Sequence, residues 1–199
     1  SKDLDEFVKE SVNELIGKEQ KPNGNSKDVV LYGFGRIGRL ITRLLIEDSG
    51  GGDNLRLRAI VVRKSSEDDI VKRANLLRTD SVHGPFKGTV RVERETETLI
   101  INGNEVKIIY ANSPEQINYT EYDIKDALLI DNTGIWREKE ALSKHLECEG
   151  ISKILLTAPG KKGVKNIVYG INNDVLLETE EIVGAASCTT NAIVPVLKA

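Results

Sequence analysis

The feature that most constrains this chain is a strand, a glycine-rich turn and a helix that follow one another in its first quarter. Residues 28–32 form a short apolar run of β type, and a Gly-x-Gly-x-x-Gly motif follows directly at residues 33–38. Apolar side chains then recur with helical spacing through residues 37–45. This order predicts a dinucleotide site in a βαβ unit of the Rossmann type.

Each part of the motif has a physical task at such a site. Gly33 makes the turn, Gly35 lets the backbone approach a pyrophosphate, and Gly38 lets the helix pack closely on the strand. Backbone N–H groups at the start of the helix, around Arg36 and Ile37, then favour the anion. The alternative is an ordinary tight turn, because the motif is a weak signal outside this context.

Further along the chain, strands and helices alternate. Apolar runs at residues 55–62, 127–130 and 153–156 predict strands, and residues 67–77 and 139–146 predict helices between them. Residues 89–109 predict short antiparallel strands with a hairpin turn at Asn102 and Gly103. The alternation predicts an α/β fold with a doubly wound parallel sheet. No metal site is expected.

Composition excludes several classes of function. The net charge of −3 argues against nucleic acid as the primary partner, and no apolar run approaches the ~20 residues that span a bilayer. Two cysteines, Cys148 and Cys188, in 199 residues fit a reducing compartment, so we expect a cytoplasmic protein.

Three segments are predicted along the chain. Residues 1–27 form an extension, in which residues 3–16 have the apolar spacing of an amphipathic helix and a polar linker follows. That helix either packs on the domain or a neighbouring subunit, or serves a dedicated partner. Residues 28–185 form the dinucleotide-binding domain, and residues 186–199 begin a catalytic domain that we expect to continue beyond the given sequence.

A cysteine with polar neighbours stands near the end of the chain. Cys188 lies between a short predicted strand and a predicted helix, and hydroxyl side chains flank it. A helix N-terminus stabilises a thiolate, which is the reactive form of the side chain. The alternative is a small buried apolar residue, but the flanking Ser, Thr and Asn residues are poor core residues.

The two motifs together resemble phosphorylating glyceraldehyde-3-phosphate dehydrogenases. The Ser-Cys-Thr-Thr-Asn string at residues 187–191 is similar to the active-site string of that family, and the glycine motif is similar to its opening. Similar stretches follow in family order at residues 80–84, 132–134 and 157–159, so the resemblance covers about residues 28–199.

The resemblance implies a mechanism and a set of site residues. Cys188 attacks the aldehyde of glyceraldehyde 3-phosphate, hydride passes to NAD or NADP, and inorganic phosphate cleaves the resulting thioester. Ser187 and Thr189 contact the phosphate groups. The cofactor is bordered by Asn112, Thr133 and Thr157, although either threonine hydroxyl can instead cap local backbone. The family also implies a glycolytic, tetrameric enzyme.

The end of the second strand bears on the choice of cofactor. An acidic residue there normally binds the ribose 2′-hydroxyl of NAD, and by counting this position falls on Val62. The basic residues Arg63 and Lys64 follow, and they either accept the 2′-phosphate of NADP or are ordinary solvated charges. Both NAD and NADP therefore remain candidates.

A cysteine nucleophile also needs a base, normally a histidine. The chain has two histidines: His83, in a loop not used for that purpose in the family, and His145, in a helix of surface type. The family's base follows the cysteine helix, so we expect this chain alone to turn over negligibly. Two alternative functions remain: a non-catalytic dinucleotide-binding or assembly module, and a dehydrogenase for a longer phosphosugar aldehyde.

Overall fold

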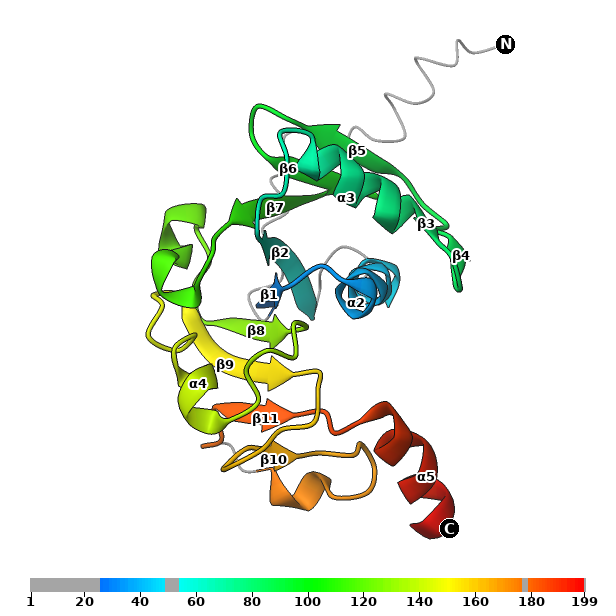
Figure 1. Cartoon of the computed structure of the whole chain (residues 1–199), viewed down its shortest axis with the longest axis vertical. Coiled ribbons are helices and arrows are strands. Elements are labelled where there is room, and N and C mark those ends of the chain that lie inside the picture. Colours follow the sequence, from blue (N-terminus) through cyan, green and yellow to red (C-terminus); the bar gives the residue numbers. More distant parts are fainter. Residues whose placement is uncertain (1–25, 49–53, 177–178, 199) are drawn as a thin grey trace, which may run out of the picture.

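The computed structural model describes residues 26–48, 54–176 and 179–198. These residues form a mostly parallel nine-stranded sheet with helices on its faces (Figure 1), which confirms the predicted Rossmann-type α/β fold. The predicted extension helix at residues 3–16 lies outside the described residues. The helices and short 3-10 helices are α2 (Arg36–Asp48), α3 (Asp69–Arg78), α4 (Lys139–Ser143), α5 (Cys188–Lys198), η1 (Pro114–Gln116), η2 (Tyr119–Tyr122) and η3 (Asn173–Val175).

The strand order is that of a doubly wound sheet. In order across the sheet the strands are β10 (Lys165–Asn166), β11 (Ile182–Gly184), β9 (Ile151–Leu156), β8 (Ala127–Asp131), β1 (Lys27–Tyr32), β2 (Leu55–Val62), β7 (Asn104–Tyr110), β6 (Thr98–Ile101) and β5 (Val90–Glu93). A separate two-stranded ribbon pairs β3 (Thr79–Asp80) with β4 (Gly84–Pro85). The order runs outward in both directions from the pair β1 and β8, so the topological switch point lies between them.

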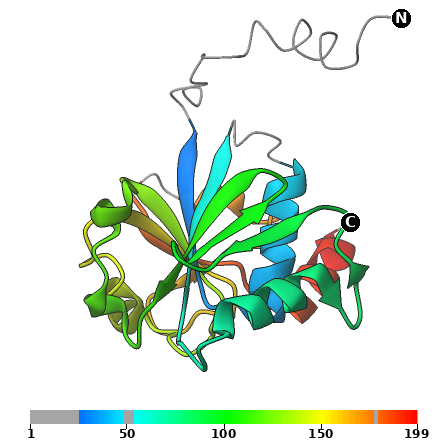
Figure 2. The ribbon, with the colours of Figure 1, turned by 90° about the horizontal axis from the view of Figure 1, so that it is seen from above.

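Alternating side chains of the parallel strands fill a core on each face of the sheet. On β1, Val29 and Leu31 pack toward α2 and α3, whereas Val30 and Tyr32 pack toward η1, η2 and α4. Figure 2 shows the two groups of helices on opposite sides of the sheet. Both faces of the central strands are buried, which explains why their sequences are continuous apolar runs.

Most predicted elements are confirmed with small shifts of their ends. The hairpin turns at Asn102 and Gly103, whose positive φ angles of 48° and 85° suit a two-residue turn between β6 and β7. The helix predicted at residues 139–146 is shorter, because the backbone N–H groups of His145 and Leu146 bond to carbonyls three residues back, those of Leu142 and Ser143.

The register of the parallel strands forms the edge where the site lies. Tyr32 pairs with Asp131, Asp131 with Leu156, and Leu156 with Gly184. The last residues of β1, β8, β9 and β11 therefore stand in one row across the sheet, and the loops after them emerge at the same edge. Figure 1 shows the arrowheads of β8, β9 and β11 pointing the same way, with α5 beyond them.

Candidate cofactor site and reactive cysteine

The glycine turn between β1 and α2 has the geometry that a dinucleotide requires. Gly33 has a φ of 94°, and its N–H donates to the Val61 carbonyl at 2.9 Å. A Cβ at Gly38 would lie 2.5 Å from the Gly33 carbonyl oxygen, so the helix packs on the turn as closely as glycine permits. A Cβ at Gly35 would meet no protein atom within 4 Å, which leaves the backbone there open to a ligand. The residues present therefore fit a bound pyrophosphate.

A second loop is attached to this turn through Arg36. Its guanidinium lies 3.6 Å from the carboxylate of Asp80 and donates to the Ser81 hydroxyl at 3.2 Å. Asp80 is buried, and it also pairs with Arg39 and His83. Backbone N–H groups of the loop, His83 first, hold the pKa of Asp80 well below its ordinary value. The Arg36 side chain thus joins the fingerprint to the loop, while its backbone begins α2.

The two threonines predicted beside the cofactor use their hydroxyls within the protein. The Thr133 hydroxyl and backbone N–H both bond to Asp131 Oδ1 at 2.7 Å, and its methyl group lies 2.8 Å from the position of a Cβ on Gly33. The Thr157 hydroxyl and backbone N–H both donate to the Asp131 carbonyl at 3.0 Å. Local capping, the alternative considered from sequence, describes both hydroxyls, and the methyl group of Thr133 faces the glycine turn.

The interpretation of His145 as a surface residue is wrong. Its ring is completely buried, and Nε2 lies 3.4 Å from Oδ2 of Asp131, which is also completely buried. Tyr32 and Trp136 contact the ring edge to face, with centroid distances of 4.7 and 5.5 Å. Burial raises the pKa of Tyr32 to about 12, and the carboxylate of Asp131 adds to the shift.

The end of β2 differs from what counting predicted. Val62 packs in the same core cluster as residues of α2 and α3 and is 6% exposed. The exposed residues are Arg63 and Lys64, which follow it. Lys64 lies 3.7 Å from Glu97 and over the ring of Tyr110.

Sequence reasoning missed the carboxylate that organises this loop. Asp69, at the start of α3, is 1% exposed and accepts hydrogen bonds from Ser65 and Arg73. Burial opposes its ionisation, but the bonds from Arg73 and Ser65 outweigh that effect and lower its pKa. Arg73 also donates to the Arg63 carbonyl at 2.8 Å. The loop that carries Arg63 and Lys64 is therefore attached to α3 by hydrogen bonds to Asp69 and Arg73.

Asn112, predicted near the adenine, follows β7 two strands from the glycine turn. Its side chain is exposed, and its backbone N–H donates to the Gln116 side chain at 3.0 Å. The backbone N–H of Ala111 donates to the Val62 carbonyl at 3.0 Å. Asn112 therefore lies at the same edge of the sheet as the end of β2.

Cys188 is the first residue of α5, and its side chain is exposed. The bend before it is built by Ala186, which has a φ of 57°, a strained value for alanine. The Ser187 hydroxyl accepts from the backbone N–H of Thr190 at 3.0 Å and lies 3.0 Å from the Thr189 hydroxyl, so it caps the helix. Asn191 donates to the carbonyls of Ala185 and Ser187. We call residues 185–191 the cysteine elbow.

The other cysteine is in a different environment. Cys148 is buried behind α4, and its thiol donates to the Pro114 carbonyl at 3.1 Å. Burial raises its pKa to about 11, and the carboxylates of Glu115 and Glu147 add to the shift. Of the two thiols, that of Cys188 is therefore the accessible one.

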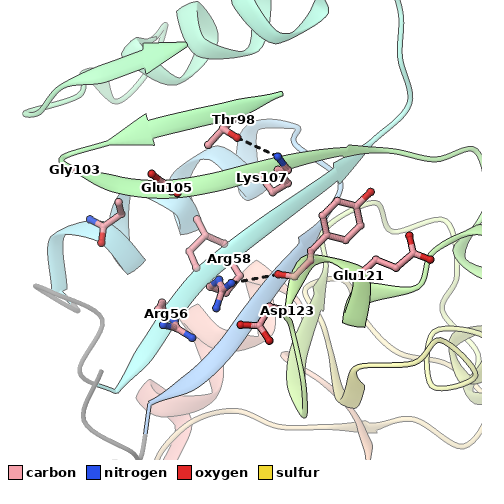
Figure 3. A pocket seen from close by; sticks show the side chains of 11 residues that line it. Arg56, Arg58, Thr98, Gly103, Glu105, Lys107, Glu121 and Asp123 are labelled. Atoms are coloured by element: carbon pink, nitrogen blue, oxygen red, sulfur yellow. Dashed lines mark hydrogen bonds between the residues drawn. The ribbon is translucent and has the colours of Figure 1, made fainter. Parts of the chain in front are cut away.

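A large open hollow of about 1050 Å³ lies elsewhere, over β2, β6 and β7 beside η2. Figure 3 shows its charged lining, which includes Arg56, Arg58, Lys107 and Asp123. The arginines pair with Asp28, and Arg58 also donates to the Tyr122 carbonyl. The hollow lines the first half of β2, away from the glycine turn, so it is not the dinucleotide crevice.

Within the described ranges, no cluster of three or more His, Cys, Asp or Glu side chains is arranged to hold a metal ion. In the same ranges, no helix is long and apolar enough to cross a membrane.

The glycine turn at the switch point of a doubly wound sheet defines a dinucleotide-binding Rossmann domain. A sequence profile described as "Glyceraldehyde 3-phosphate dehydrogenase, NAD binding domain" matches residues 27–139. The chain belongs to the glyceraldehyde-3-phosphate dehydrogenase family and carries its NAD-binding domain, which confirms the resemblance of the motifs.

Curated relatives agree with this assignment. The chain is 59% identical over 196 residues to a "glyceraldehyde-3-phosphate dehydrogenase-like protein" of Pseudomonas aeruginosa (strain UCBPP-PA14), covering 98% of this chain and 42% of the relative. It is 36% identical over 171 residues to the glyceraldehyde-3-phosphate dehydrogenases of Streptococcus pyogenes and Lactococcus lactis, covering 86% of this chain and 47% of each relative. The chain thus spans less than half the length of these relatives.

Proposed function

We propose that this chain is the cofactor-binding part of an enzyme that oxidises glyceraldehyde 3-phosphate to an acyl phosphate, with NAD or NADP and inorganic phosphate. The observation that carries the proposal is the position of Cys188. Its exposed thiol begins α5, directly after β11, at the same edge of the sheet as the glycine turn. Hydride transfer from a substrate bound covalently to a cysteine needs the nucleophile and the dinucleotide crevice at the same edge of the sheet.

In the proposed reaction the Cys188 thiolate attacks the aldehyde carbon, and the new C–S bond gives a thiohemiacetal. Oxidation of the thiohemiacetal to a thioester removes a hydride from its carbon and the proton from its hydroxyl group, and NAD or NADP, if bound, would supply the hydride acceptor. An oxygen of inorganic phosphate attacks the carbonyl carbon of the thioester. The C–S bond then breaks, which releases the acyl phosphate and returns Cys188 to its thiolate form. Ser187 and Thr189, beside the thiol, supply hydroxyls for the phosphate groups.

The thiol still needs a base, and neither histidine of this chain is free for that task. His145 is buried against Asp131, and the His83 ring bonds to Asp80 at 3.1 Å. We therefore propose that the isolated chain binds cofactor and turns over negligibly, because loss of a general base costs ~10²–10⁴-fold in rate. Robust aldehyde oxidation by the purified 199-residue chain would contradict this.

The test of the catalytic role uses the whole protein that contains this chain. Cys188→Ser is expected to lower the rate of nicotinamide reduction by glyceraldehyde 3-phosphate by at least ~10³-fold while NAD still binds. The matched control, Cys148→Ser, is expected to stay active. An active Cys188→Ser variant would favour a role without this chemistry, such as a dinucleotide-binding or assembly module. A higher kcat/KM for a phosphosugar aldehyde one carbon longer would reassign the substrate.

We further propose that the adenosine end of the site accepts NADP as well as NAD. The support is the exposed pair Arg63 and Lys64 at the end of β2, on a loop attached to α3 by Asp69 and Arg73. The carboxylate of Asp69 is occupied by these bonds, and Val62 is apolar and buried. Glu97 lies 3.7 Å from Lys64, so Arg63 is the cation of this pair that can favour a 2′-phosphate.

Calorimetric titration of Arg63→Ala tests this subsite. The variant is expected to lose about tenfold in affinity for NADP and less than twofold for NAD, because only NADP carries the 2′-phosphate. Arg91→Ala, at an exposed position on β5, is the control and is expected to change neither affinity. Equal losses for both cofactors would show that Arg63 does not contact the 2′ position.

We also propose that the whole protein is a cytoplasmic homo-oligomer, a tetramer by analogy with the family. The support is the family membership together with apolar side chains that stay exposed on α5, Val196 and Leu197. Light scattering of the whole protein measures the mass of the assembly, and a monomer would contradict the proposal.

A further inference from the structure

A buried polar network lies directly behind the wall of the cofactor crevice. Asp131 ends β8 beside the switch point, and its two carboxylate oxygens face different ways. Oδ1 accepts both bonds from Thr133, as described above. Oδ2 is buried without a hydrogen bond among the described residues, and the nearest group of opposite character is His145 Nε2 at 3.4 Å. The carboxylate therefore links the imidazole to the turn after β8.

The contact assigns a proton to Nε2 of His145. Two lone pairs facing each other across 3.4 Å would repel, whereas an imidazole N–H beside a carboxylate oxygen attracts it even where the contact falls outside hydrogen-bond geometry. Neither ring nitrogen of His145 has a hydrogen-bond partner among the described residues, and Nε2 lies 3.4 Å from Asp131 Oδ2. The aromatic rings of Tyr32 and Trp136 enclose the imidazole on its other sides and hold its plane.

The turn on the other side of the carboxylate touches the fingerprint. The Thr133 methyl group stands 2.8 Å from where a Cβ would lie on Gly33, and the Thr133 hydroxyl in turn accepts from the backbone N–H of Ile135 at 3.2 Å. If the hydroxyl left Oδ1, the methyl group would rotate with it about the same bond. The position of this wall against Gly33 therefore depends on the charge and direction of the Asp131 carboxylate.

We propose that His145 is a positioning residue for the cofactor site, which acts through Asp131 to hold Thr133 against the first glycine of the fingerprint. His145 itself touches no part of the crevice. Its task is to keep the carboxylate oriented, so that Oδ1 stays on the turn and the wall keeps the shape that receives a dinucleotide. The inference rests on the proposed binding of a nicotinamide cofactor and deepens it.

Two variants of His145 separate the N–H donor from the shape of the ring. His145→Gln keeps a side-chain N–H that can point to Asp131, and His145→Phe keeps a flat ring between Tyr32 and Trp136. Calorimetric titration of this chain with NAD is expected to show about a tenfold weaker Kd for His145→Phe and less than a threefold change for His145→Gln. The reverse order would overturn the proposal, because it would show that packing alone matters.

A double-mutant cycle tests the route through the carboxylate. Thr133→Val removes the hydroxyl that bonds to Oδ1 while keeping the size of the side chain, and it too is expected to weaken NAD binding about tenfold. Combined with His145→Phe, the loss is expected to stay near tenfold, because both changes release the same turn. A hundredfold loss in the double variant would mean that the two residues act independently and would overturn the proposal.

Leu142→Val is the control for a purely structural effect. Leu142 is completely buried on α4 in the same core, and its side chain is apolar. This variant is expected to lower the urea midpoint and leave the Kd for NAD unchanged. If His145→Phe lowers the midpoint and also leaves the Kd unchanged, His145 is structural only. If the unaltered chain does not bind NAD, the proposed cofactor binding is wrong. If it binds NAD but His145→Phe binds equally well, only the positioning role of His145 is wrong.

Nitrogen NMR of the imidazole provides an independent readout that needs no ligand. The ring of His145 is expected to carry its proton on Nε2, and Asp131→Asn is expected to change that signature, because an amide then faces the ring. The exposed ring of His83, bonded to Asp80, gives the reference signal in the same spectrum. A His145 ring protonated on Nδ1 alone would contradict the assignment.

Discussion

The glycine turn and the cysteine elbow lie at one edge of one sheet, yet their surroundings differ. Residues 33–38 are held on both sides, by Val61 through the N–H of Gly33 and by Thr133 across the switch point. The cysteine elbow is well bonded within itself, but α5 beyond it has no buried residue. The glycine turn is thus fixed by neighbouring strands, whereas α5 packs no side chain into the core among the described residues. The difference shows that two loops at one edge of a sheet can be fixed in different ways, one by the strands beside it and the other by bonds within itself.

The largest expected effect is on thiol labelling, which contrasts the elbow with the core. Iodoacetamide at pH 7.5 is expected to label Cys188 at least ~100-fold faster than Cys148. Burial raises the pKa of the Cys148 thiol from 9.0 to about 11, which reduces its thiolate fraction at this pH about 100-fold. Because the pKa of Cys148 is raised, its labelling should increase as the pH rises toward 11. Peptide mass mapping measures both rates, and equal labelling at pH 7.5 would break the comparison.

The next effect distinguishes two glycines of the fingerprint. Gly35→Ala is expected to leave the urea midpoint unchanged and weaken NAD binding about 100-fold, because its Cβ meets no protein atom but enters the space of the ligand. Gly38→Ala is expected to weaken binding and also destabilise the fold by about 1–3 kcal/mol, because its Cβ would meet the Gly33 carbonyl at 2.5 Å. Normal NAD affinity in Gly35→Ala would place the pyrophosphate elsewhere.

A third prediction compares the stability contributions of the two regions. Leu31→Ala on β1, at a completely buried position, is expected to cost about 3 kcal/mol in the free energy of unfolding. Leu197→Ala on α5, where the side chain is 79% exposed, is expected to change it by less than about 0.5 kcal/mol in this chain. In the whole protein the cost at Leu197 should rise if another surface covers α5. Urea denaturation of both forms measures the change.

The smallest expected effect tests the independence of the two regions. Cys188→Ser is expected to change the Kd for NAD of this chain by less than about twofold, because the fingerprint and its wall come from β1, α2 and the turn after β8. Calorimetry measures the affinity directly. A tenfold loss would mean that the elbow contributes to the cofactor site already in this chain.

The local elements of both regions were determined by the sequence. The strand, glycine motif and helix at residues 28–47 and the hairpin at Asn102 and Gly103 were predicted because their causes are local: apolar periodicity and backbone conformations that glycine adopts readily. The start of a helix near Cys188 was also predicted, and the structure adds a local cause, because the Ser187 hydroxyl caps that helix. The family resemblance followed from the same strings of residues.

The tertiary structure decided which polar groups are buried and which of them act together. Nothing in the sequence around His145 places its ring against Asp131, because the two residues come from separate elements that meet only when β8 and the turns after α4 pack together. Likewise Val62 was expected to face a ribose, and its actual burial depends on the face of β2 that α2 and α3 cover. Hydrophobic periodicity and local hydrogen bonds depend on residues that are close in the sequence, whereas burial and long-range pairing depend on the packing of the whole chain.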